Sequence, residues 1–238
     1  MKLAGHQPAY LPYLGLFFKM TLCDKFMFVD HVQFEKKGFQ NRNYVRGKTG
    51  RILLTVPVLT KGRYYQRTDD VIIDDAIHWA RKHWRTISLN YHSAPFFDDH
   101  RDFFEGVYAK QWRRLVDLNV AITLYLMKCF GIEKEILYSS QHDIAGDKTA
   151  MLIDMCRKSG ADTYVSGWGG KSYVDVAEFQ RLGLGHRFVQ LSHPIYPQQG
   201  EPFIPNLAAI DLLLNCGPES RRVLDEAARR STVEHYEP

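Results

Sequence analysis

The sequence is poor in cysteine and contains no long apolar run. Its four cysteines lie far apart and form no CxxC pair, which argues against a disulfide framework and a zinc knuckle. No apolar stretch reaches the length of a bilayer span, so no membrane helix is predicted. The first residues lack the apolar core and the small-residue cleavage site of a secretory signal. A cytoplasmic protein without membrane contact is therefore predicted.

Signatures of several enzyme classes are missing as well. The ten histidines form no HExxH or comparable ligand cluster, so no metal site is predicted. Acyl-enzyme chemistry has no support, because neither a GxSxG elbow nor a recognisable cysteine-nucleophile motif is present. The phosphate-loop and GxGxxG patterns are also absent. Catalysis by positioning and electrostatics fits the polar residues better.

The composition is that of one ordinary globular domain. Hydrophobic residues make up 45% of the 238 residues and charged residues 24%, and a chain of this length can bury one substantial core. A single domain over residues 1–238 is predicted. The formal charge of +4 suits a small phosphate-bearing substrate. A charge of this size does not require a nucleic-acid partner, and it is compatible with a tRNA partner.

Short apolar runs alternate with helical patterns near both ends of the chain. Residues 3–7 and 26–29 are predicted strands on either side of a helix over 14–22. The alternation resumes in the second half of the chain, with strands predicted at 163–166 and 186–190. This order favours an α/β fold with a mostly parallel, doubly wound, Rossmann-like sheet.

The middle of the chain has a different pattern. Helical periodicity over 76–89 and 101–130 predicts a helical layer or lobe inserted around residues 75–130. Residues 52–56 have strand propensity, and 71–73 are predicted as a further short strand.

Three polar segments follow predicted strands and form the candidate active site. His6 and Gln7 lie at the carboxyl end of the first strand, where open α/β sheets bind ligands. The second segment is dense in amides and cations, which could orient a base, a sugar or an amide and clamp an anion: Asp30, Gln33, Lys37, Gln40, Asn41, Arg42 and Asn43. The third has glycines that permit close backbone approach and an anion nest: Ser166, Gly167, Gly169, Gly170 and Tyr173.

Each segment also has a plainer interpretation. His6 and Gln7 could satisfy backbone groups of their own loop. Lys36 and Lys37 could belong to a solvated surface, and the glycines could form an ordinary tight turn.

The same segments resemble a known family. The runs His6-Gln7-Pro8-x-Tyr10-x-Pro12-x-x-Gly15-x-Phe17, Asp30-x-Val32-Gln33-Phe34 and Gln40-Asn41-Arg42-Asn43 are similar to the signature of the WbqC-like protein family. Further matches follow in order: Leu54-Thr55-Val56-Pro57-Val58, Asn90-Tyr91, Tyr164-x-Ser166-Gly167-x-Gly169-Gly170-x-x-Tyr173, Tyr196-x-Gln198 and Asp211-Leu212-Leu213-x-Asn215-x-Gly217. Two positions depart from the family pattern. Tyr13 stands where tryptophan is common, which keeps an aromatic wall, and Ala208-Ala209 replaces a serine-containing pair.

The resemblance implies a role in bacterial surface-polysaccharide, O-antigen or other biosynthetic clusters, in the tailoring of a nucleotide-linked sugar. The leading hypothesis is an enzyme that forms an amide on an amine such as an amino sugar nucleotide. It would use acyl or aminoacyl transfer, or ATP-dependent ligation with magnesium, and a tRNA or a carrier protein could deliver the activated donor. The predicted catalytic residues are His6, Gln7, Asp30 and Arg42. Tyr10 and Gln198 join the polar groups above as predicted substrate-binding residues.

A weaker similarity provides one of two alternatives. The order of a strand, a proline-containing turn, a helix and a strand that ends in Phe28-Val29-Asp30 resembles pantothenate synthetase and the nucleotidylyltransferase fold. Leu14-Gly15-Leu16 stands where that fold has its HxGH signature. A nucleotidylyltransferase-like enzyme and a non-catalytic ligand-binding protein are therefore the alternatives.

Overall fold

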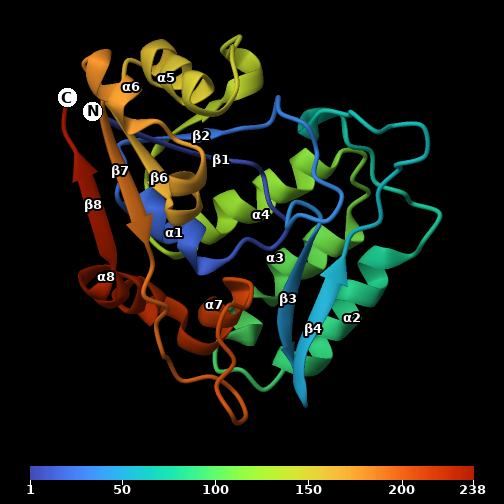
Figure 1. Ribbon diagram of the computed structural model, residues 1–238. Helices are drawn as coiled ribbons and strands as arrows, with labels where there is room; N and C mark the ends of the chain where they lie inside the picture. Colours follow the sequence, from blue (N-terminus) through green and yellow to red (C-terminus); the bar gives the residue numbers. More distant parts are fainter.

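The computed structural model describes residues 1–238 and contains two sheets with helices around them (Figure 1). The strands are β1 (Lys2–His6), β2 (Lys25–Phe28), β3 (Arg42–Gly47), β4 (Gly50–Thr55), β5 (Glu135–Tyr138), β6 (Thr163–Gly167), β7 (Gly185–Gln190) and β8 (Thr232–Tyr236). The α-helices are α1 (Leu14–Thr21), α2 (Trp79–Tyr91), α3 (Phe97–Ala109), α4 (Leu115–Cys129), α5 (Lys148–Ser159), α6 (Val176–Arg181), α7 (Ile210–Cys216) and α8 (Ser220–Arg230). No helix combines the length and the apolar character needed to cross a membrane.

The larger sheet has six strands in the order β5-β2-β1-β6-β7-β8. All neighbouring pairs are parallel except β7 and β8, which are antiparallel. This confirms the predicted α/β fold with a mostly parallel, Rossmann-like sheet. Because β2 pairs with one side of β1 and β6 with the other, the direction of winding changes between β1 and β6.

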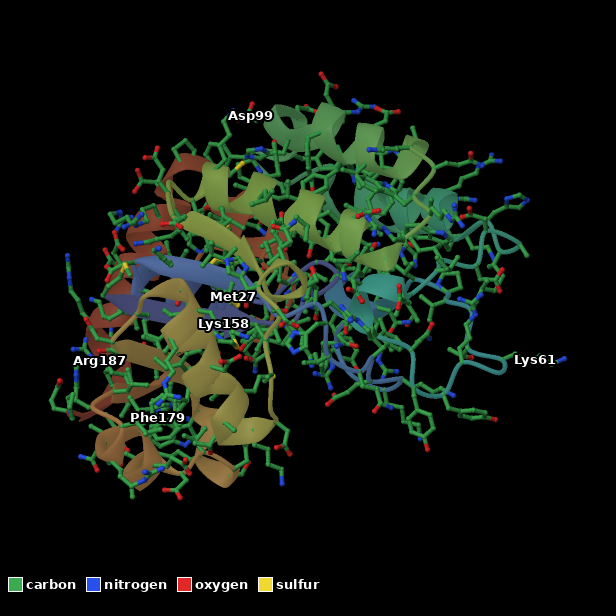
Figure 2. The ribbon with its side chains drawn as sticks, turned by 90° about the horizontal axis from the view of Figure 1, so that it is seen from above. Met27, Lys61, Asp99, Lys158, Phe179 and Arg187 are labelled. Carbon is green, nitrogen blue, oxygen red and sulfur yellow. The ribbon has the colours of Figure 1, made fainter.

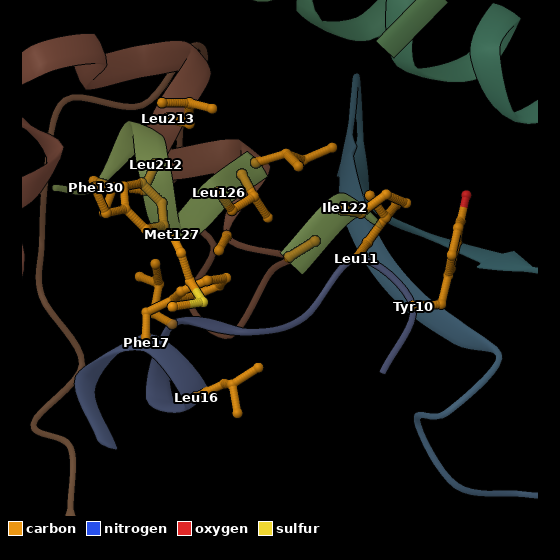
Figure 3. Packing of buried hydrophobic residues seen from close by; sticks show 14 of the residues in the cluster. Tyr10, Leu11, Leu16, Phe17, Ile122, Leu126, Met127, Phe130, Leu212 and Leu213 are labelled. Atoms are coloured by element: carbon orange, nitrogen blue, oxygen red, sulfur yellow. The ribbon is translucent and has the colours of Figure 1, made fainter. Parts of the chain in front are cut away.

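Alternate residues of the central strands face opposite sides of this sheet, as strand geometry requires. Leu3 and Met27 pack with α5 and α6, whereas Ala4 and Phe26 pack with the larger core on the other side. Figure 1 shows α5 and α6 above the sheet and α1 and α4 below it. In the larger core, side chains of α1, α4 and α7 interlock, with Phe17 and Phe130 in an edge-to-face contact (Figure 3).

The predicted helical lobe is present, although its details differ. Residues 101–130 are not one helix, because the backbone is extended at Lys110 and again at Arg114, which separates α3 from α4. Residues 71–73 are not a strand either, since they make only isolated bridges to Val58 and Arg114. The hairpin of β3 and β4 packs beside α2 (Figure 1).

Candidate functional site

A cleft opens at the carboxyl ends of β1 and β6, where the winding direction of the sheet changes. This is the place at which open α/β sheets bind ligands. Two adjoining cavities, of about 390 and 290 Å³, form the cleft. They share four lining residues: Tyr13, Lys19, Gly167 and Gly169. We call this space the switch-point cleft.

Lys19 is the cation of the switch-point cleft. Its side chain is only 6% exposed, and its ammonium group donates a 2.6 Å hydrogen bond to the carbonyl oxygen of Gly5. Lys19 forms no salt bridge, and no aspartate or glutamate lines either cavity. Burial lowers the pKa of Lys19 to about 8. A buried cation without a counter-ion is costly, and a bound anion would supply the missing charge.

The N-terminus of α1 adds to this positive potential. The helix begins after Tyr13 without a side-chain cap: the N–H of Leu16 donates to the carbonyl of Tyr13, and no side chain of the N-cap accepts from the first turn. Gly15 and Lys19 are four residues apart and therefore lie on one face of α1, and both line the cleft. A Cβ on Gly15 would lie 2.2 Å from the ring of Tyr13, so any larger residue there would displace that ring. The N-terminus of α1 and the ammonium group of Lys19 therefore both contribute positive potential to the switch-point cleft.

His6 is the candidate base of the switch-point cleft. Its Nδ1 lies 2.7 Å from the carbonyl oxygen of Gln7, so Nδ1 carries the proton and Nε2 is the acceptor. Nε2 has no hydrogen-bond partner within the chain. Burial, and secondly the charge of Lys19, lower the pKa of His6 to about 4. His6 is therefore neutral near pH 7, with a lone pair that can accept a proton.

Two glycines in the turn after β6 leave space that the chain does not use. A Cβ on Gly167 or Gly169 would meet no atom within 4 Å, and neither residue has a positive φ. Their lack of a side chain is explained neither by packing nor by backbone strain. Gly170 differs, because its Cβ would lie 3.0 Å from the Cβ of Ser166. The open side of Gly167 and Gly169 faces the cleft, where a ligand can approach the backbone.

Among the other predicted site residues, Gln7 and Tyr173 also line the switch-point cleft. Ser166 lies beside it, but its hydroxyl is buried and bonded to Nε2 of His186 at 3.0 Å. The predictions for the first and third segments therefore converge on one cleft.

The amides of the second segment form buried hydrogen bonds within the chain, and one of them supports a residue of the cleft. Gln40 donates to the side-chain oxygen of Gln7 at 2.6 Å and accepts from the backbone N–H of Glu35 at 2.8 Å. Asn41 donates to the carbonyl of Val56, and Asn43 to that of Leu11. All three amides are buried and do not line the cleft. They position Gln7 and the loops rather than contact a ligand there.

Asp30 and Arg42, both predicted to be catalytic, lie outside the cleft. The carboxylate of Asp30 is buried and accepts hydrogen bonds from the hydroxyls of Ser139 and Ser140, at 2.9 and 2.8 Å, and from the backbone of Ser140. These bonds join the ends of β2 and β5. Arg42 donates to the backbone carbonyls of Gly38 and Lys37, which closes the turn before β3.

Tyr10 and Gln198 belong to two buried networks away from the cleft. The hydroxyl of Tyr10 contacts Nδ1 of His83 at 2.8 Å and the hydroxyl of Tyr108 at 2.6 Å. Gln198 donates to the fully buried carboxylate of Asp211 at 2.6 Å. Gln33 and Lys37 are exposed on the surface beyond the second strand. The structure therefore brings only part of the predicted set together.

The sequence did not single out Lys19, Trp168 or His193, which also line the switch-point cleft. A signal for Lys19 existed, because a lysine in an otherwise apolar helical run, four residues after Gly15, lies on the face that packs against the sheet. Trp168 follows Gly167 in the segment already selected.

These features define the protein's class as an α/β protein with a cleft at the switch point of a mostly parallel sheet. The model of the WbqC-like protein family matches residues 7–223, and the chain belongs to that family. Rv1507c of Mycobacterium tuberculosis, described by its name as an uncharacterized protein, is 32% identical over 221 residues, which are 92% of this chain and 95% of that protein. No solved structure gives a significant match. Family membership indicates a biosynthetic role.

Proposed function

We propose that this protein is a biosynthetic enzyme that forms an amide by transferring an acyl or aminoacyl group to the amine of a small phosphate-bearing substrate, such as an amino sugar nucleotide. One observation carries the proposal: Lys19, a buried cation with no counter-ion, lines the same cleft as the neutral His6. The ammonium group of Lys19 suits the binding of a phosphate. The neutral imidazole of His6 suits the removal of a proton from an attacking amine.

The proposed reaction assigns each group a step. The amine nitrogen of the acceptor attacks the carbonyl carbon of the activated donor, so a C–N bond forms and the bond from that carbon to the carrier's oxygen or sulfur breaks. Nε2 of His6 accepts the proton that the nitrogen loses and returns it to the departing oxygen or sulfur. Lys19 and the N-terminus of α1 hold the phosphate, and Gln7 orients the acceptor.

The size and the lining of the cleft agree with a substrate of this kind. The larger cavity, of about 390 Å³, lies within the range of small-molecule sites, and the smaller one, of about 290 Å³, adjoins it. His6 lines only the larger one, which supports binding of the reacting amine in that cavity. The smaller one is lined by Trp168, Leu191 and Val189, which suit the less polar part of a nucleotide.

A mass-spectrometric assay tests the proposal. The protein is incubated with a UDP-linked amino sugar that has a free amine, together with a CoA thioester, with an amino acid and ATP, or with a charged tRNA. The proposal predicts a product heavier by the acyl group, and His6→Gln should slow its formation about 100-fold or more while UDP-sugar binding persists. A UDP-linked amino sugar that binds in the cleft but is acylated by none of these donors contradicts the proposal and favours a non-catalytic binding protein.

Nucleotidylyl transfer is the second candidate, because the cleft lies where related α/β sheets bind nucleotides and the turn after β6 leaves its backbone open. It predicts pyrophosphate release from a nucleoside triphosphate with no amide product. ATP-dependent ligation would release pyrophosphate or phosphate together with an amide. A coupled phosphate assay beside mass spectrometry therefore separates the two.

A further inference from the structure

The segments 33–42 and 59–67 concentrate positive charge on one part of the surface. They contain six lysines and arginines and one acidic residue, whereas the formal charge of the whole chain is +4. The remainder of the chain is therefore close to neutral. Figure 2 shows Lys61 at the tip of the loop that extends farthest from the large sheet. A charge excess confined to two loops is typical of a surface that meets a polyanion.

Most of these cations are free to meet a partner. Arg67 pairs with Asp69, and Arg42 donates to backbone carbonyls. No ion pair is formed by the other four: Lys36, Lys37, Lys61 and Arg63, all of them exposed. Besides Asp69, two acids stand nearby, Glu35 and Asp70, and Asp70 lies close to Arg67 and Arg114.

Two exposed tyrosines lie between these cations. Tyr64 is 69% exposed and Tyr65 86%, although tyrosine rings are usually at least half-buried. They separate two hollows of about 640 and 680 Å³, and both rings line both hollows. The ammonium group of Lys36 lies 4.4 Å from the centre of the Tyr64 ring. Exposed aromatic faces among cations are the parts that bind single-stranded nucleic acid, whose bases stack on the rings.

The loop that carries the tyrosines is held in place by the segment beside it. The backbone N–H of Phe34 donates to the carbonyl of Gln66 at 3.0 Å, and that of Thr68 to the carbonyl of Val32 at 2.8 Å. The side chain of Gln33 donates to the carbonyl of Tyr64 at 3.2 Å. The rings therefore stand on an ordered platform, which reduces the entropy that binding would cost. We call residues 33–39 and 59–67 together the tyrosine surface.

The chain runs directly from the switch-point cleft into the tyrosine surface. Val32 lines the larger cavity of the cleft, and the next two residues, Gln33 and Phe34, line a hollow beside Tyr64. The side chain of Gln40 makes a second connection, because it accepts from the backbone N–H of Glu35 and donates to the side-chain oxygen of Gln7. The segment that carries the tyrosine surface therefore borders the cavity that His6 lines.

We propose that the tyrosine surface binds single-stranded RNA whose 3′ end carries the acyl or aminoacyl ester consumed in the cleft. This rests on the proposed function and names the source of the donor. In the transfer step the carbonyl carbon leaves the ribose oxygen, to which the proton returns, and joins the amine nitrogen. An RNA ester needs no further activation at this site, because the energy of the ester bond drives amide formation.

Fluorescence anisotropy with a labelled single-stranded RNA of about 12 nucleotides, within the usual site size, tests the proposal on the full chain. Tyr64→Ala and Tyr65→Ala should each weaken binding about fivefold or more. Lys61→Ala with Arg63→Ala should reduce the slope of log K against log salt by about 0.7 for each phosphate that the variant no longer neutralises. Arg229→Ala with Arg230→Ala, which removes two exposed cations from the end of α8, is the matched control and should change neither quantity.

Three results would overturn the proposal: no RNA binding at low salt, equal binding by the tyrosine variants, or tyrosine-dependent binding of an acidic carrier protein in place of RNA. The cleft is tested separately in the same samples. The tyrosine variants should retain stabilisation by UDP, and Lys19→Met should retain RNA binding. If RNA fails to bind while UDP still stabilises the protein, this inference is wrong and the proposed function stands.

Discussion

The ammonium nitrogen of Lys19 lies 2.6 Å from the carbonyl oxygen of Gly5, which joins the last turn of α1 to the end of β1 inside the switch-point cleft. That hydrogen bond satisfies one of the three N–H donors of the lysine and none of its charge. The adjacent cavities contain no carboxylate. An anion is therefore the ligand that the cleft lacks, and four predictions follow from it and from the buried histidines.

Gly169→Ala should abolish ligand binding and leave the fold intact. The new methyl group meets no protein atom within 4 Å, so the melting temperature should stay within a few degrees. It occupies the space in which a phosphate would approach the backbone. Gly106→Ala is the matched control, because it also meets no atom within 4 Å but lies in α3. Equal ligand binding by both variants, measured by calorimetry with UDP, would place the ligand elsewhere.

Lys19 should make the free energy of unfolding depend on pH in the alkaline range. Its pKa is about 8 when folded and 10.5 in the ordinary state, so the unfolded chain binds a proton between these values that the folded chain does not. Stability should therefore rise with pH across this window, by about 3 kcal/mol. Urea titrations of the wild type and of Lys19→Met should differ by this rise. Parallel curves for the two proteins would mean that Lys19 is well solvated.

His6 should become more basic when an anion binds. The charge of Lys19 is a cause of its low pKa, and a bound phosphate offsets that charge. The NMR signal of the His6 ring should titrate near pH 4 in the free protein and at higher pH with UDP. Lys19→Met should raise the pKa without ligand. If neither UDP nor this substitution moves the titration, then Lys19 does not act on His6.

As the pH falls, the protein should lose stability at pH values above those at which its carboxylates become protonated. Burial lowers the pKa of His6, His83 and His186 to about 4 each, from 6.5. Between these values the unfolded chain binds more protons than the folded one, so stability falls as the pH falls. Each histidine contributes at most about 1.4 kcal/mol per pH unit. Urea titrations between pH 7 and 4 measure the slope, and His83→Gln should make it shallower. An unchanged slope would show that folding does not lower the pKa of His83.

The sequence predicted most of the fold because burial patterns are local. Apolar runs at β1, β2 and β6 and the helical period of α5 are visible along the chain, and the break at Gly160 is set by its left-handed φ of 70°. β3 was missed because Asn43 has low strand propensity, and its hydrogen bond to Leu11 is a long-range contact. β8 was missed because its strand exists only by pairing with β7.

The candidate site was predicted in part, for a related physical reason. Polar residues at strand ends converge when their strands are neighbours, which is why His6 and Gly167 meet. An amide-rich segment does not reveal whether its amides face a ligand or the backbone. Gln40 and Asn41 proved to be buried among backbone groups. Lys19 was overlooked because its isolation from carboxylates is a property of the packed structure.

The most direct measurement is the thermal stability of the purified protein with UDP-linked amino sugars, nucleoside triphosphates, CoA thioesters and free amino acids. A ligand at a hundred times its dissociation constant adds about 2.7 kcal/mol. We predict that UDP-linked amino sugars raise the melting temperature of the wild type and of Gly106→Ala, and fail to do so for Gly169→Ala and Lys19→Met. No shift for the wild type with any phosphate-bearing compound, or equal shifts for all four proteins, would contradict an anionic substrate in the switch-point cleft.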